Sequence, residues 1–145
     1  MNTQNFAALG LAAALSLGSL ATVSLVQAPV RAEKTADVQA SGTFIGSAPK
    51  NVTGQAQIVT KDGKRYLVLD QTFQSDNGPD LFVLLHNEAK PSSYRNNFHN
   101  LGRLQKVSGT QWYEISAEVN LSEAKSVVVW CRQFNVTFGY ATLGS

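Results

Sequence analysis

The segment Gln57–Leu69, with the sequence QIVTKDGKRYLVL, decides the fold class of this protein. Two runs rich in β-branched and apolar residues flank the dipeptide Asp62-Gly63. Asp-Gly supplies the positive φ angles that a tight hairpin turn requires. The segment therefore predicts two antiparallel strands joined by a short turn.

Similar short runs recur on both sides of this hairpin, and clusters of Gly, Asn and Asp separate them. No long segment shows the 3.6-residue period of a helix, although Leu121–Lys125 offers one helical turn with Asn120 as its cap. The pattern predicts an all-β, single-domain antiparallel β-sandwich or barrel-like fold of about eight short strands. The expected strands are Gly42–Ile45, Gly54–Thr60, Arg65–Asp70, Leu81–His86, Gly102–Val107, Gln111–Ala117, Ser126–Cys131 and Asn135–Leu143.

The last expected strand has the clearest alternation. Phe134, Val136, Phe138 and Tyr140 occupy every second position, and Asn135, Thr137, Gly139 and Ala141 occupy the others. Because successive side chains of a strand point to opposite faces, the first set is predicted to face the core.

The segment Asn87–Asn100 is rich in Asn and Ser, contains Pro91 and has no apolar period. We expect a surface loop there. Loops of this length often carry binding residues, and the alternative is a solvated connection without a function.

The N-terminal segment is typical of an export signal. Phe6–Val26 has no charged side chain, and Val30-Arg31-Ala32 offers a small-x-small cleavage site before Glu33. We interpret residues 1–32 as a signal peptide, residues 33–39 as a short polar tether and residues 40–143 as the β domain. The expected location is periplasmic or extracellular. The alternative is a membrane anchor made by the uncleaved segment, which is long enough to span a bilayer.

Composition excludes several classes of function. The formal charge of +2 without a basic cluster argues against a nucleic-acid partner. The single cysteine excludes a disulfide within the chain and a Cys-rich zinc site, so no metal site is expected. A blue-copper centre is excluded because both histidines precede the cysteine and the only methionine is the initiator.

Cys131 is the main candidate for chemistry. It ends the run Val127-Val128-Val129-Trp130-Cys131, where it shares a strand face with Val127 and Val129. In an exported protein an unpaired thiol is at risk of oxidation unless it is sheltered or used. Cys131 is either a redox thiol or ligand, or a small buried hydrophobe. In the first case, a nearby Arg132 guanidinium would favour the thiolate form.

Non-covalent haem needs only one His, Cys or Tyr ligand, so composition leaves it open as a cofactor. His86 and His99 are weak candidates for cofactor binding. The alternative for both is a surface or hydrogen-bonded histidine.

The segments Gly78-Pro79-Asp80-Leu81 and Trp130-Cys131, followed by the ending Phe138-Gly139-x-Ala141-x-Leu143, resemble the DM-thirteen domain over about residues 40–143. This small extracellular module often occurs beside DOMON domains. The resemblance implies an all-β fold and an electron-transfer role in which Cys131 acts as a thiol or binds a prosthetic group such as haem. The loop Ser47–Thr53 lacks the histidine that many members carry there.

Two functions follow as hypotheses. The first is an exported electron-transfer module centred on Cys131, an accessory rather than an enzyme by itself, whose partner is a redox protein or a cell-surface component. The second is a non-catalytic β-sandwich that binds a protein or glycan through its loops, with Cys131 as core packing.

The export interpretation predicts a mature chain that begins at Glu33, because signal peptidase cuts after a small-x-small site. N-terminal sequencing or intact mass of the exported protein measures this directly. Recovery of Met1 in the membrane fraction would show instead that the segment is an anchor.

Overall fold

The computed structural model describes residues 35–145, and the predicted signal peptide lies outside this range. Within it, no helix is long and apolar enough to cross a membrane. The all-β prediction is confirmed, and the one helical element described is the predicted short turn capped by Asn120. The elements are β1 (Asp37–Gly46), β2 (Val52–Thr53), β3 (Gln55–Lys61), β4 (Lys64–Leu69), β5 (Gln74–Ser75), β6 (Leu81–His86), β7 (Phe98–Arg103), β8 (Gln111–Ile115), η3 (Leu121–Glu123), β9 (Ser126–Cys131) and β10 (Val136–Thr142).

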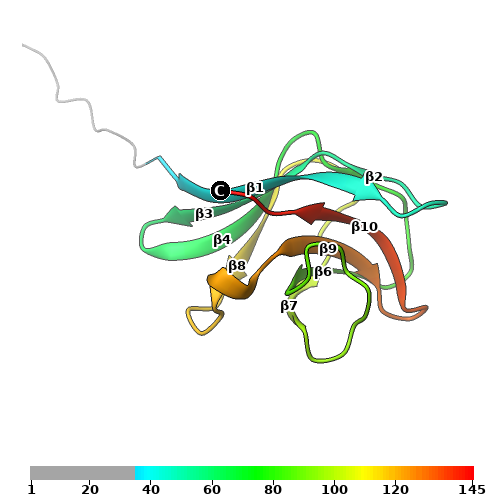
Figure 1. The fold of residues 1–145 in the computed structure, drawn as a ribbon. Helices are drawn as coiled ribbons and strands as arrows, with labels where there is room; N and C mark the ends of the chain where they lie inside the picture. The colour runs from blue at the N-terminus through cyan, green and yellow to red at the C-terminus, as the bar shows by residue number, and fades with distance from the viewer. Residues whose placement is uncertain (1–34) are drawn as a thin grey trace, which may run out of the picture. The chain divides into compact units, whose positions relative to one another are not determined.

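Eight of these strands form one antiparallel sheet in the order β7-β6-β9-β10-β1-β3-β4-β8, and β2 pairs with β5 (Figure 1). The sheet curls until its edge strands β7 and β8 approach each other. Side chains bridge these edges in place of a ladder: the Gln105 backbone N–H donates to the Tyr113 hydroxyl (2.9 Å), and Gln105 Nε2 donates to the Trp112 carbonyl (2.7 Å). The result is a nearly closed barrel.

The predicted hairpin is confirmed. β3 and β4 pair from Ala56↔Leu69 to Lys61↔Lys64, which leaves Asp62 and Gly63 as the two-residue turn. Both have positive φ, 52° at Asp62 and 78° at Gly63, as a turn that follows the right-handed twist of the strands requires.

Strand β1 joins the two halves of the barrel, because it pairs first with β3 and then with β10. At the crossing, a Cβ atom on Gly42 would lie 2.2 Å from the Thr142 carbonyl oxygen. Only glycine permits this close approach. The strand begins at Asp37, so the prediction of a free tether through residue 39 is wrong at its end: Asp37 and Val38 pair with Thr60 and Val59.

Apolar side chains form two layers. The inner core fills the barrel, and the outer aromatic cluster covers β6 and β9 from outside, where the loop 87–97 lies over it (Figure 1). The largest members of the inner core include Phe44, Leu67, Leu69, Phe73, Val83, Leu85, Val127, Val129 and Phe138. The outer aromatic cluster consists of Phe82, Leu84, Val128 and Trp130 with Tyr94, Phe98 and Tyr140 packed against them.

The seventh strand lies earlier than the expected range Gly102–Val107, and the long loop is correspondingly shorter than Asn87–Asn100. Phe98–Arg103 pairs with β6, since this register lets Phe98 pack against Trp130. Lys106 is held by the Gln111 side chain instead: its N–H donates to Gln111 Oε1, and its carbonyl accepts from Gln111 Nε2.

The predicted inward face of the last strand is confirmed at Phe138 and wrong at Phe134, Val136 and Tyr140. Phe134 and Val136 are exposed (62% and 38%), whereas Phe138 is buried in the inner core (3%). The pairing of β10 with β9 shifts between Thr137 and Gly139, so an irregularity interrupts the alternation. Beyond it Ala141 faces the inner core, and Tyr140 packs on the outer cluster.

This arrangement predicts unequal effects for Phe138 and Phe134, which are four positions apart in the chain. Phe138→Ala should lower the free energy of unfolding by about 3–5 kcal/mol, because it empties a buried site. Phe134→Ala should change it by no more than about 0.5 kcal/mol. Denaturant titration of both variants measures this, and equal effects would contradict the assignment of faces.

Candidate functional site

Cys131 ends β9, the strand between β6 and β10 whose six residues are all buried. The strand separates the two apolar layers: Val127, Val129 and Cys131 belong to the inner core, and Val128 and Trp130 to the outer cluster. The predicted face of Cys131 is therefore confirmed. Its exposed fraction is 0%, so the thiol is completely enclosed.

The register places Cys131 opposite Leu81 of β6 and Val136 of β10. Thiol–disulfide exchange needs direct attack of one sulfur on another, so it depends on access to the sulfur. The enclosed thiol cannot take part in it while the domain is folded. Any chemistry at this residue in the folded state must proceed without contact between the sulfur and a second sulfur.

The Gly78-Pro79-Asp80-Leu81 motif holds Arg132, the residue that directly follows β9. The Asp80 carboxylate accepts from Arg132 Nε (3.2 Å) and forms an ion pair with Arg103 Nη1 (3.1 Å), and the Arg132 N–H donates to the Asp80 carbonyl (3.0 Å). The Arg132 guanidinium also lies 4.5 Å from the centre of the Phe82 ring, which belongs to the outer cluster. Arg132 is thus held on the outer face, away from the inner face where the thiol lies.

Trp130 is the centre of the outer aromatic cluster. Its ring, 8% exposed, stacks on Tyr94 with centroids 5.1 Å apart and planes at 22°, and Phe98 lies 5.8 Å away. Trp130 Nε1–H donates to Asn135 Oδ1 (3.0 Å). Burial raises the pKa of Tyr94, and its hydrogen bond with Thr137 offsets this only in part, so the phenol is neutral at neutral pH.

His86 holds the loop that carries Tyr94. Its ring is fully buried; Nε2 donates to the Ser93 carbonyl (2.7 Å), and Nδ1 accepts from the Glu88 N–H (3.0 Å). The Ser126 hydroxyl donates to the Glu88 carbonyl (2.7 Å), which ties the same loop to β9. Both ring nitrogens of His86 are occupied, so neither is free to bind a cofactor. The segment expected as a surface loop, either binding or merely solvated, also covers the outer cluster through Tyr94.

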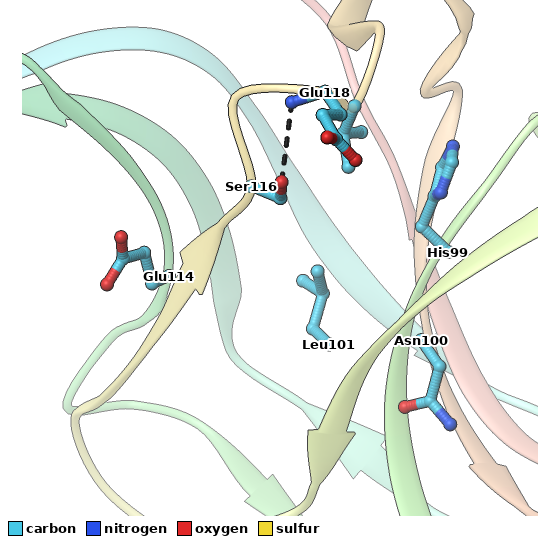
Figure 2. A pocket seen from close by; sticks show the side chains of 7 residues that line it. His99, Asn100, Leu101, Glu114, Ser116 and Glu118 are labelled. Carbon is cyan, nitrogen blue, oxygen red and sulfur yellow. Dashed lines mark hydrogen bonds between the residues drawn. The ribbon is translucent and has the colours of Figure 1, made fainter.

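His99 lies elsewhere, on the exposed side of β7 at the gap between the barrel edges. A cavity of about 470 Å³ opens there, lined by His99, Asn100, Leu101, Glu114, Ser116, Glu118 and Val119 (Figure 2). Figure 2 shows the Glu114 side chain directed away from His99, and its carboxylate forms an ion pair with Lys64 (3.6 Å). Among residues 35–145, no group of three or more His, Cys, Asp or Glu side chains could hold a metal ion.

Comparison with known families identifies the barrel. The family described as Electron transfer DM13 matches residues 43–143, from β1 through the end of β10. The chain belongs to the electron-transfer DM13 family. The match confirms the DM-thirteen resemblance and includes Cys131 and the Gly78–Leu81 motif. Separate searches of curated proteins and of solved structures found no match.

Haem does not fit the residues that this DM13 domain offers. Cys131 lies on the inner face at one end of β9, whereas His86 pairs with Ser126 at the other end and contacts Tyr94 on the outer face. His99 lines a separate cavity, and Cys131 lines neither that cavity nor three others in the described part of the chain. The candidates therefore do not converge on one site, and no step is assigned to haem.

The sequence pattern did not reveal Tyr94, the residue that completes the cluster. It lies in a loop without period, so no strand or helix template places its side chain. An aromatic residue within an otherwise polar loop could have indicated this role, because such a ring usually packs on an apolar surface.

The enclosure of Cys131 predicts that its thiol reacts with a disulfide reagent only as fast as the domain opens. Ellman's reagent should show almost no reaction in native buffer and one thiol per chain in denaturant. A matched control is Phe134→Cys in a Cys131→Ala background, where the new thiol occupies an exposed position and should react at once. Rapid native labelling of Cys131 would contradict the structure.

Proposed function

We propose that this DM13 protein is an exported electron-transfer module and that Cys131 is its redox residue. The observation that supports this most is the position of the only cysteine: it is sealed in the core directly after Trp130, whose ring belongs to the cluster on the other face of β9. Family membership supports the class of activity, and the position of Cys131 supports the choice of residue.

The enclosure narrows the chemistry that Cys131 could perform. Exchange with a partner thiol requires an accessible sulfur, whereas an electron moves between groups by electronic coupling through the intervening atoms. The proposal is therefore transfer of single electrons between Cys131 and a redox partner protein or a cell-surface component. The protein acts as an accessory in this scheme and needs no substrate pocket of its own.

The proposed location suits an enclosed thiol. In a periplasmic or extracellular compartment an accessible single cysteine would pair with other molecules. Burial in the inner core removes that reaction and leaves the thiol intact for the proposed electron exchange.

A second candidate function is a non-catalytic barrel that binds a protein or glycan partner through its loops. Its specific support is the same complete burial of Cys131 among Val127, Val129 and other apolar residues, which suits a cysteine that acts as a small hydrophobe.

The two functions differ in the expected behaviour of Cys131→Ala and Cys131→Ser. If Cys131 is the redox residue, protein-film voltammetry should show a signal in the parent that both variants lose, while circular dichroism shows a retained fold. Serine adds a hydroxyl in an apolar site and should cost about 1–3 kcal/mol of stability, which alanine avoids. The pair therefore separates loss of the thiol from loss of packing.

Identical voltammetry in the parent and both variants would end the proposal for Cys131. If only the stability fell, the binding function would be favoured, and its partner could be sought with the loops intact.

A further inference from the structure

The outer aromatic cluster holds two oxidisable rings, Trp130 and Tyr94, in direct contact. Four ring pairs lie within 5.1–6.1 Å of each other between centroids: Tyr94–Trp130, His86–Tyr94, Phe98–Trp130 and Tyr94–Phe98. Of these four residues, tryptophan and tyrosine lose a single electron most readily. They are also the pair that is stacked and closest together.

We infer that Trp130 and Tyr94 form a redox pair, in which Trp130 gives an electron to an acceptor at the surface and Tyr94 replaces it. The acceptor is a one-electron oxidant of the metal-complex class. Trp130 is also buried (8% exposed), but it lies in the outer cluster, covered only by the loop 87–97, whereas Cys131 (0% exposed) lies in the inner core.

The electrons and protons balance as follows. The acceptor takes one electron from the indole of Trp130, and the resulting radical cation keeps its Nε1–H on Asn135. Tyr94 then gives one electron to Trp130, which restores the indole. The Tyr94 O–H bond breaks as a proton passes to the Thr137 hydroxyl, and Thr137 releases its own proton to water. The net result is one electron on the acceptor, one proton in water and a tyrosyl radical.

Two features of the site suit this series of electron and proton transfers. Tyr94 is a neutral phenol because burial raises its pKa, so its oxidation must be coupled to proton loss. Its hydroxyl already has a hydrogen-bond partner in Thr137, on β10, that is itself only partly buried. His86 holds the loop from the other side, and its ring packs edge-on against Tyr94 at 5.4 Å.

This inference rests on the proposed function for its biological meaning, but the pair itself does not require the thiol. Trp130 and Cys131 are consecutive residues on opposite faces of β9. The same tryptophan is therefore also the aromatic group linked most directly to the enclosed sulfur.

Flash photolysis of the purified protein with photo-oxidised ruthenium tris-bipyridine tests the pair. The Trp112→Phe background is used, because Trp112 is more exposed (39%) and packs against a different tyrosine, Tyr66. Trp130 is then the only indole. The expected result is a Trp130 radical that converts into a tyrosyl radical in a phase whose rate does not depend on oxidant concentration and is slower in D₂O.

Tyr94→Phe keeps the ring and removes the hydroxyl. It should abolish this phase and lengthen the lifetime of the Trp130 radical by about tenfold or more, equivalent to roughly 1.4 kcal/mol in activation free energy. The matched control is Tyr140→Phe, since Tyr140 packs against the same cluster without a close ring contact to Trp130. It should leave the phase unchanged. Persistence of the phase in Tyr94→Phe, or its loss in Tyr140→Phe, would overturn the inference.

Cys131→Ala separates this inference from the proposed function. An unchanged tyrosyl phase in Cys131→Ala supports the pair whatever the voltammetry of the thiol shows. If the parent has a thiol signal but no tyrosyl phase, Cys131 remains the redox residue and the pair is rejected.

Discussion

The burial of β9 on both faces is the constraint on which the rest of the structure depends. Its inner residues complete the barrel core, and its outer residues need a second apolar layer because the outside of a barrel otherwise meets water. Full burial also explains the composition of the strand: after Ser126 come three consecutive valines, a tryptophan and a cysteine, with no polar residue among them. The neighbouring β6 is buried along its whole length for the same reason.

The second layer depends on polar groups at its margins. His86 uses both ring nitrogens to hold the loop that delivers Tyr94, and Ser126 at the start of β9 bonds the same loop. At the other end of the strand, Asp80 holds two arginines beside Phe82. These bonds satisfy buried polar atoms, and they also hold the aromatic rings in contact, with Tyr94 stacked on Trp130.

The enclosure of Cys131 changes what an electron-transfer role could mean for this DM13 protein. A thiol that no reagent reaches is protected from disulfide formation, and within residues 35–145 it belongs to no group of three or more side chains that could hold a metal ion. The outer face of β9 is covered only by the aromatic cluster and its loop. Under the proposed function, electron exchange with a partner would cross the sheet through the consecutive residues Trp130 and Cys131, with the aromatic rings as the end of the route nearer the surface.

Local patterns in the sequence determined the all-β class, the Asp62-Gly63 hairpin, the bounds of β6 and β9 and the face of Cys131, because each depends on residues close together in the chain. Only the tertiary structure decided the features that depend on contacts between residues far apart in the chain. The register of β10 against β9 breaks the alternation of the last strand and leaves Phe134 in water. Tyr94 finds its place only because Trp130 offers an uncovered ring, and the complete enclosure of Cys131 needs β6 and β10 on either side. Contacts between segments far apart in the chain leave no period in the sequence, so no local pattern could have predicted them.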